Sequence, residues 1–296
     1  MPELPEVETV RRGLNRLIVG KTIKAVAHDT PKNFPNAQGD VDEFLIGATV
    51  VGVRRRAKVI LIDLSSDYTL VVHLKMTGQM VYVGQHEQQW GAGHPNDSLV
   101  GHLPDKSTRV TIEFTDDSRL YFNDFRKFGW VKLYATIEVP NIDFMRRVGP
   151  EPLEDDFTAT QFEERFARRR RTSIKAALLD QTVVAGVGNN YADEALWSAH
   201  IHPARLVGSL SQDELHKLYT QVRAVMNLSI EKGGSSNSTY RDAEGNKGSY
   251  MQFANVFRRE GQPCVRHADV VIQKSRVAGR GTHTCPACQP EPEKAL

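Results

Sequence analysis

The feature of this sequence that most restricts its fold is a change of hydrophobic period partway along the chain. From about residue 21 to 134, apolar and polar residues alternate in short runs separated by polar turns, the pattern of half-buried strands. After a stretch with three prolines at 139–156, apolar residues recur every three or four positions, as in helices that bury one face. Strands followed by helices, rather than alternating with them, predict an α+β fold with separate parts.

The first part contains enough short strand candidates to predict a sandwich or barrel. Residues 5–18 are expected to form a flanking helix, because their apolar residues are three and four positions apart. Asp116-Asp117-Ser118 is expected to connect two strands of a hairpin, and residues 84–107 to form a long polar loop. The expected strands cover residues 22–26, 49–53, 59–64, 70–74, 80–83, 110–114, 120–122 and 130–134.

The second part is expected to be helical. Thr158–Gln161 and Ser211–Glu214 both have the capping-box pattern that opens a helix, and the second helix is expected to end at Gly233-Gly234. Two shorter helices are expected at 174–180 and 190–199. The turn between them contains Gly186-Val187-Gly188, whose backbone N–H groups could bind a phosphate, although a plain helix–helix turn is the alternative. Residues 235–249 are expected to form a flexible loop.

The three cysteines all lie in the last 33 residues, which indicates a local metal site rather than a disulfide framework. Cys264 and His267, followed by Cys285 and Cys288, fit a closed, tetrahedral structural zinc site. The alternative is three unrelated cysteines and a surface histidine. Because the module is short, we expect the metal to supply its folding free energy. Residues 277–282 are expected to form the hairpin turn, with Arg280 at its tip.

The net charge of the whole chain does not indicate a nucleic-acid partner, but two short basic runs do. The net charge is only +2, yet Arg54–Arg56 and Arg168–Arg171 are dense basic runs. The second run, with Lys175, could neutralise phosphates, and a solvated basic helix face is the alternative. The sequence contains neither a transmembrane-length apolar run nor a secretory start, so a cytoplasmic protein is expected.

Pro2 would become a free secondary amine if Met1 were removed. An α-amino group titrates near pH 8 and is partly neutral in a cell, so it can act as a nucleophile and form an iminium. Glu3 could shuttle protons for it. The alternative is that Pro2-Glu3 merely begins a helix. Similarly, Phe128 is either an exposed wedge or a buried hairpin aromatic, and Met76 could belong to the core.

Together these motifs resemble those of the bacterial formamidopyrimidine-DNA glycosylases, base-excision repair enzymes for oxidised purines. The resemblance extends from the first residue to about Gln289. It rests on residues 2–10, Arg56-Ala57-Lys58, residues 73–78, 123–129, 178–181 and 186–189, Ile201-His202-Pro203 and residues 279–283.

The resemblance implies an α+β fold in five parts. These are an N-terminal catalytic β-sandwich at 1–138, a linker at 139–156, a helical helix–two-turns–helix domain at 157–250, a zinc-finger hairpin at 251–290 and a disordered tail at 291–296. It also implies a monomer that binds double-stranded DNA containing damaged bases, without a membrane, in the cytoplasm in association with the nucleoid.

The activity that the resemblance implies is bifunctional, combining a DNA glycosylase with an abasic-site lyase. Pro2 would attack the sugar C1′, Glu3 would be the acid/base there, and Glu6 would lie close by. Lys58 would contact a phosphate and donate a proton in β-elimination. Arg280 would grip the lesion's phosphate and assist δ-elimination.

The resemblance also assigns residues that contact DNA. His73, Arg170, Lys175 and Asn189 match the contacting positions. Met76, Arg126 and Phe128 match side chains that fill the hole left by the everted base, which must leave the duplex before its glycosidic bond can be reached. Tyr240, with Ser238 and Thr239, matches the region that closes over that base.

Two departures from the family pattern bear on these assignments. His267 stands where relatives usually have a fourth cysteine, and His283 is the alternative ligand. A family DNA contact just before Val110 falls on Lys106-Ser107-Thr108-Arg109, where Arg109 could substitute for the usual histidine. The rival interpretations are an endonuclease VIII-like glycosylase for oxidised pyrimidines and a non-catalytic zinc-dependent DNA-binding module. The wide separation of Met76, Arg126 and Phe128 in the sequence and the start Leu4-Pro5-Glu6 disfavour the endonuclease VIII-like enzyme. A binding module is disfavoured because it has no need of Pro2 at the second position.

Overall fold

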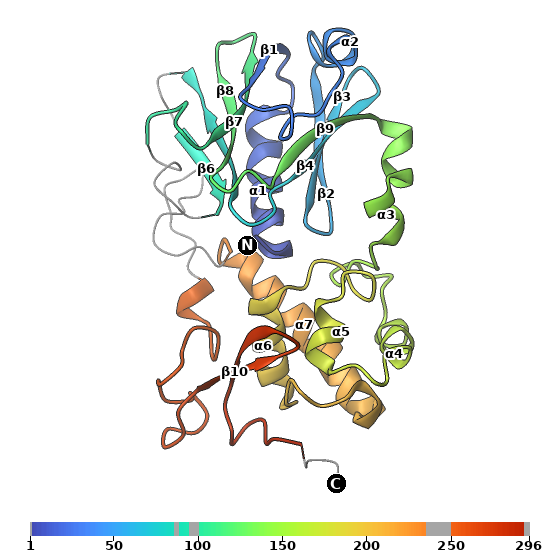
Figure 1. Cartoon of the computed structure of the whole chain (residues 1–296), viewed down its shortest axis with the longest axis vertical. Coiled ribbons are helices and arrows are strands. Elements are labelled where there is room, and N and C mark those ends of the chain that lie inside the picture. The colour runs from blue at the N-terminus through green and yellow to red at the C-terminus, as the bar shows by residue number, and fades with distance from the viewer. Residues whose placement is uncertain (1, 86–88, 95–100, 235–249, 293–296) are drawn as a thin grey trace. The chain divides into compact units, whose positions relative to one another are not determined.

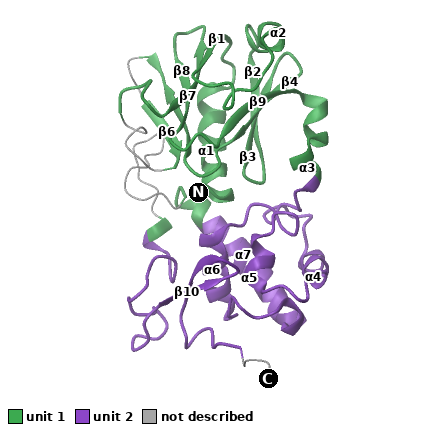
Figure 2. Ribbon diagram, in the orientation of Figure 1, with its two compact units in different colours: residues 1–146, 229–251 green, residues 147–228, 252–296 purple. Residues whose placement is uncertain are grey.

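The computed structural model describes residues 2–85, 89–94, 101–234 and 250–292 (Figure 1). Residues 1–146 and 229–251 form one compact unit, and residues 147–228 and 252–296 form another (Figure 2). The first unit is built mainly of strands and the second mainly of helices, which confirms the predicted α+β class. The predicted loop at 235–249, with Tyr240, lies outside the described residues. The five-part division predicted from the sequence stays a prediction.

The first unit contains two antiparallel sheets. One has the order β2-β3-β4-β9, and the other has the order β1-β7-β8-β5-β6. Hairpin connections join β2 to β3, β3 to β4 and β7 to β8, as the alternating sequence pattern predicts. The strands are β1 (Ile23–His28), β2 (Val50–Arg56), β3 (Val59–Leu64), β4 (Tyr68–His73), β5 (Gly78–Val83), β6 (Gln89–Gly93), β7 (Thr108–Phe114), β8 (Arg119–Asp124) and β9 (Trp130–Ala135).

Helix α1 (Leu4–Ile18) shares one hydrophobic core with both sheets. Its apolar stripe of Val7, Val10, Leu14 and Ile18 is buried, which confirms the predicted helix. Alternate residues of the strands, such as Ile60 of β3, complete this core. A short helix α2 (Gln38–Asp40) and a π-helical turn η1 (Val41–Leu45) precede β2.

One sequence prediction in this unit is wrong. Residues 84–107 are not wholly loop, because β6 lies within them and extends the second sheet beside β5. Trp90 of β6 is buried against α1 at Gly13, where an added Cβ would lie 1.9 Å from the indole ring. The linker expected at 139–156 stays a prediction, and the structure describes short helical turns within it. It contains much of the 3₁₀ turn η4 (Thr136–Asn141) and the helix α3 (Asp143–Arg147), whose apolar side chains pack on the other face of the first sheet.

The second unit begins with α4 (Ala159–Ala167), opened by the predicted capping box between Thr158 and Gln161. Helices α5 (Ile174–Leu179) and α6 (Asn189–Ala199) follow, then the 3₁₀ turn η5 (Val207–Ser209). Helix α7 (Gln212–Glu231) is opened by the second capping box, in which Ser211 and Glu214 bond reciprocally. These helices confirm the predicted helical part. None of the helices in the described ranges has the length and apolarity required to cross a membrane.

The chain ends in a cysteine-bearing module that starts with the 3₁₀ turn η6 (Tyr250–Gln252) and contains the hairpin of β10 (Gln273–Val277) and β11 (Arg280–Thr284). The turn is shorter than predicted and consists of Ala278 and Gly279, which both have positive φ. This is the backbone twist that two-residue hairpin turns require. Arg280 is therefore the first residue of β11 and pairs with Val277, rather than lying at the tip.

Candidate active site

Pro2 lies immediately before α1 and is buried. Glu3 is the N-cap of the helix, and Glu6 is its third residue. The two form a reciprocal capping box in which Glu6 Oε2 accepts from the Glu3 N–H at 2.9 Å. Both carboxylates are almost fully buried. The helix start therefore fixes the backbone next to Pro2, and the structure brings Pro2, Glu3 and Glu6 together.

Lys58 and His73 lie at the same edge of the first sheet, one in a turn and the other at the end of a strand. Lys58 follows Ala57 in the two-residue turn between β2 and β3, and His73 ends β4 opposite Val59. The turn is tied to α1 because Arg55 donates to the Ala57 carbonyl at 2.9 Å and forms an ion pair with Glu8 at 3.2 Å. Lys58 is nonetheless only 8% exposed. The hairpin thus holds an ammonium group close to the imidazole of His73.

His73 is neutral in this arrangement. Burial, followed by the charges of Lys75 and Lys58, lowers the pKa of His73 to about 3. The backbone N–H of Lys75 donates to Nδ1 at 3.1 Å, so Nδ1 is the acceptor nitrogen and Nε2 carries the proton. The ring packs edge-on against Trp130 and Phe144. His73 can therefore donate one hydrogen bond to an anion without carrying a charge.

Met76, Arg126 and Phe128 come together on two exposed loops of the first unit. Arg126 approaches the Met76 sulfur at 2.9 Å, and its guanidinium lies 4.9 Å from the centre of the Phe128 ring. Met76 is 42% exposed and Phe128 is 46% exposed, so the buried alternatives for both residues are wrong. Apolar side chains on exposed loops next to a cation can insert between bases.

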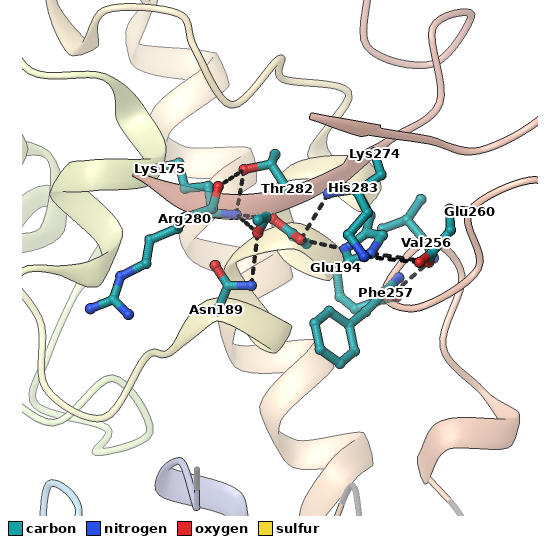
Figure 3. A network of polar contacts seen from close by, with 12 residues as sticks. Lys175, Asn189, Glu194, Val256, Phe257, Glu260, Lys274, Arg280, Thr282 and His283 are labelled. Atoms are coloured by element: carbon teal, nitrogen blue, oxygen red, sulfur yellow. Dashed lines mark hydrogen bonds and ion pairs between the residues drawn. The ribbon is translucent and has the colours of Figure 1, made fainter. Parts of the chain in front are cut away.

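In the second unit, Lys175 is the centre of a buried polar network (Figure 3). Its ammonium bonds Asp193 Oδ1 at 2.6 Å, the Gly281 carbonyl at 2.9 Å and Thr282 Oγ1 at 2.8 Å. The side chains of Lys175 and Asp193 are both 0% exposed. An ammonium with three such acceptors has used its three donors. In this structure Lys175 therefore holds β11 against α5 and α6. That Lys175 contacts DNA stays a prediction.

The same network supports the strand that carries Arg280. Asn189, the first residue of α6, donates to the Gly281 carbonyl at 2.9 Å, and its buried Oδ1 accepts no hydrogen bond in this structure. Arg280 is exposed, and its guanidinium extends away from the network (Figure 3). Arg170 is also exposed but lies on the turn after α4, where its carbonyl accepts from Gly208. The structure thus brings Lys175, Asn189 and Arg280 together, and Arg170 stands apart from their network.

Two acidic residues of α6 anchor the cysteine-bearing module. Asp193 Oδ2 accepts from the His283 backbone N–H at 3.0 Å and lies 3.2 Å from the His283 ring. Glu194 is buried and accepts from the backbone N–H groups of three successive residues, Asn255, Val256 and Phe257. Burial raises the pKa of Glu194, although these hydrogen bonds oppose that effect. The module is therefore attached to α6 at both of its ends.

Cys264, His267, Cys285 and Cys288 form the predicted cluster, with all four ligand atoms within 4.8 Å of one another. The sulfur atoms of Cys264 and Cys288 are 3.8 Å apart. Four ligands in a tetrahedron with zinc–sulfur bonds of about 2.3 Å would put their sulfur atoms about 3.8 Å apart. Three soft sulfur atoms and one imidazole nitrogen are a ligand set that suits zinc.

His283 is not an alternative ligand in this structure. Its ring nitrogens face Asp193 and Glu260, both at 3.2 Å. The module also buries Val256 and Ile272 with the three cysteines against Trp197 of α6, and Arg266 stacks 3.6 Å from the centre of the Trp197 ring system. The module therefore completes its small core with a side chain of α6, and the expectation that a metal supplies its folding free energy stays a prediction.

Arg109 does not replace the missing family histidine. It is only 4% exposed, pairs with Asp29 and donates to the backbone carbonyls of Lys106 and Asp124. Ser107 is also buried and bonds Asp105. A guanidinium that is buried and engaged in this way cannot reach a phosphate.

Sequence reasoning missed the buried acids that organise these groups, namely Asp124, Asp193 and Glu194. The residues around them attracted attention because lysine, arginine and glycine are readable as phosphate ligands. A single aspartate in a strand or helix carries no comparable signal. One weaker signal was available. An acidic residue at a position that the apolar pattern predicts to be buried must have a partner, because Asp and Glu are almost never fully buried without one.

Two family profiles match the chain. The formamidopyrimidine-DNA glycosylase N-terminal domain matches residues 1–131, and the formamidopyrimidine-DNA glycosylase H2TH domain matches residues 148–241. The second match covers α4 to α7 and includes the turn between α5 and α6. In that turn, Gln181 donates to the Leu179 and Val187 carbonyls and accepts from the Gly186 N–H.

Similar proteins span the whole chain. The formamidopyrimidine-DNA glycosylase of Shouchella clausii is 42% identical over 299 residues, with 99% of this chain and 100% of that protein covered. The formamidopyrimidine-DNA glycosylase of Carboxydothermus hydrogenoformans is 40% identical, with 98% and 100% covered. A solved complex between Lactococcus lactis Fpg and DNA containing an abasic site has a TM-score of 0.85 at 34% identity, with 98% and 100% covered.

Proposed function

Because the chain belongs to the formamidopyrimidine-DNA glycosylase family, we propose that it excises oxidised purines from duplex DNA and then cleaves the strand. The observation that carries the proposal is the start of α1, where a reciprocal capping box of two buried carboxylates adjoins Pro2. A helix start of this kind fixes the backbone that carries Pro2 and places two carboxylates next to it, which suits a nucleophile that needs an acid/base partner.

The proposed chemistry begins with the neutral amine of Pro2, once Met1 has been removed. Its lone pair forms a bond to C1′, and the bond from C1′ to the base breaks, so the base leaves with that electron pair and receives a proton. Glu3 is the acid/base beside this centre. The Pro2 nitrogen then gives its proton to Glu3, and its recovered lone pair forms the double bond to C1′ as the bond from C1′ to the ring oxygen breaks. The ring oxygen takes that electron pair and the proton from Glu3, which leaves an iminium between Pro2 and C1′.

Strand cleavage follows from the iminium, because it acidifies the hydrogen at C2′. Removal of that proton expels the 3′ phosphate in β-elimination, and a second elimination expels the 5′ phosphate. Lys58 donates a proton in the first step, and Arg280 grips the lesion's phosphate in the second. The support for these roles is the burial of Lys58 beside the neutral His73 and the exposure of Arg280 on a braced strand.

The remaining residues that we propose to contact DNA form two groups, one that binds phosphates and one that fills the space left by the everted base. His73, Asn189 and Arg170 contact phosphates, which position the DNA without reading its sequence. Met76, Arg126 and Phe128 fill the space left by the everted base, and Tyr240 lies in the segment that closes over that base. The support for the second group is the exposure and mutual contact of its three side chains. We propose that the protein acts as a monomer.

The metal that we propose is one structural zinc ion held by Cys264, His267, Cys285 and Cys288. When bound, it would cross-link the two ends of the hairpin module. It would take no part in the chemistry at the sugar.

The experiment that tests the proposal is trapping of the iminium. Borohydride added during cleavage of a duplex with one 8-oxoguanine should link the DNA to the N-terminal peptide, and an adduct on a lysine would overturn the role of Pro2. A variant with extra residues ahead of Pro2 should form no adduct, because its nitrogen is an amide. The matched control carries the same residues after Leu296. Faster excision from a thymine-glycol duplex than from the 8-oxoguanine duplex would instead favour the pyrimidine-specific rival.

A further inference from the structure

Asp124 is a buried carboxylate that no step of the proposed mechanism uses. It ends β8 and pairs with Gly78, the first residue of β5, so it lies between the loop before β5 and the loop after β8. Its side chain is 0% exposed. The first of these loops carries Met76, and the second carries Arg126 and Phe128. A charged side chain at such a position is expensive unless several donors face it.

The two oxygens of Asp124 bind both loops. Oδ1 accepts from the Thr77 hydroxyl and from the Arg126 N–H at 3.2 Å, and Oδ2 accepts from the Gly129 N–H at 2.6 Å. Thr77 Oγ1 in turn accepts from the Arg126 N–H at 3.1 Å. One carboxylate therefore joins the residue after Met76 to the residues on each side of Phe128.

The geometry of the loops shows why such a connection is needed. Lys75 and Lys127, which immediately precede Met76 and Phe128, both have positive φ, at 50° and 57°. Residues other than glycine persist in that region only when the surrounding structure holds them there. Gly129 also has to be glycine, because a Cβ would lie 2.9 Å from the His73 carbonyl oxygen and 3.1 Å from Asp124 Oδ2.

The backbone of Asp124 is itself braced. Its carbonyl accepts from Arg109 Nε at 2.9 Å, and its N–H donates to the Ser107 carbonyl at 2.8 Å. Arg109 is buried and paired with Asp29. The acid is thus held from behind by β7 and its preceding turn, while its side chain faces the two loops.

We propose that Asp124, acting through Thr77, is the positioning residue that fixes Met76 on one loop against Arg126 and Phe128 on the other. This inference rests on the proposed role of those three side chains in filling the duplex. Asp124 touches no DNA. It acts by keeping the three side chains in one arrangement before DNA binds, which lowers the ordering cost of inserting them.

The chemistry of the site predicts which substitutions matter. All three groups that face Asp124 are donors, whereas an asparagine side chain has one acceptor oxygen and one donor amide. In Asp124→Asn, the amide must therefore face the N–H of Arg126 or of Gly129. Thr77→Val removes the hydroxyl that joins the loops, and Thr77→Ser retains it. Asp117→Asn, at an exposed aspartate in the turn before β8, is the matched control for the loss of a carboxylate.

The test measures excision of 8-oxoguanine and cleavage of an abasic-site duplex by each variant. We expect Thr77→Val and Asp124→Asn to slow excision about ten- to a hundredfold, the rate equivalent of losing a hydrogen bond to a charged group. Cleavage of the abasic-site duplex should change less than about twofold, because unstacking costs less there. Thr77→Ser and Asp117→Asn should behave as the unsubstituted protein does.

A double-mutant cycle separates positioning from general stability. If Thr77 acts through the three side chains, Thr77→Val should add little to the loss caused by Phe128→Ala, which lies on the other loop. Fully additive losses, or unchanged excision by Thr77→Val, would overturn the inference. Unchanged excision by Phe128→Ala would instead overturn the duplex-filling role itself, so the two failures are distinguishable.

Discussion

The perturbation that best tests how the second unit is held together is Lys175→Met. Methionine is similar in length and apolar, so it fills the same space without the ammonium. Asp193 then loses its closest partner, at 2.6 Å, while Gly281 and Thr282 lose a donor each. Because the side chains of Lys175 and Asp193 are both 0% exposed, water cannot replace the missing contacts.

The magnitude follows from the carboxylate that remains. Removing one partner of a buried ion pair costs roughly 3–5 kcal/mol, because the other charge stays buried without compensation. Asp193 keeps its bond from the His283 N–H at 3.0 Å, which favours the lower end of that range. We therefore expect Lys175→Met to lower the free energy of unfolding by about 3 kcal/mol.

The assay is urea denaturation followed by circular dichroism, with the free energy obtained by linear extrapolation. Lys217→Met, at an exposed lysine of α7, is the matched control and should change stability by less than about 0.5 kcal/mol. The double variant Lys175→Met/Asp193→Asn should recover most of the loss. The amide is neutral, its oxygen can still accept from His283, and its nitrogen can donate to Thr282.

The sequence interpretation of Lys175 makes the opposite prediction. A lysine that only neutralises a phosphate would lower DNA affinity when replaced and would reduce the salt dependence of binding, with no effect on stability. A stability change below about 1 kcal/mol for Lys175→Met, together with a reduced salt dependence, would therefore refute the structural argument.

Two further predictions concern His73 and the metal. The pKa of His73 is about 3 in the folded protein and near 6.5 in the unfolded chain, so between these values the unfolded chain binds a proton that the folded protein does not. Stability is thus lost as pH falls from about 6.5 toward 3, by up to about 1.4 kcal/mol per pH unit, and urea denaturation of His73→Gln should show a slope smaller by that amount. His267→Ala should lower the zinc content below one ion per chain in metal analysis, and full retention would mean that another group completes the site. DNA affinity should fall only slightly, because Lys175 and Asp193 still hold β11 in the variant that lacks His267.

Local features of this protein follow from the sequence because each is satisfied within a short segment. The apolar spacing of Val7 to Ile18 specifies one buried face of α1. The capping boxes at Thr158 and Ser211 satisfy backbone donors of the helices that they open. The spacing of the two ligand pairs predicted the metal cluster, since a hairpin is enough to bring Cys264 and His267 to Cys285 and Cys288. The family motifs indicate which residues of the sequence belong to the site, but they do not indicate which residues contact one another.

The tertiary structure alone decided where the charged side chains lie. Lys175 and Arg109 both read as phosphate ligands, yet each is buried by acceptors that are distant in the chain. Strand β6 lies within a polar segment, and its Trp90 packs against α1 at Gly13, where there is no side chain to exclude the indole ring. Asp124 gains its role only when β5 and β8 pair and bring two loops to one carboxylate. Periodicity and capping are properties of neighbouring residues, whereas the burial of a charge depends on partners that only the folded chain supplies.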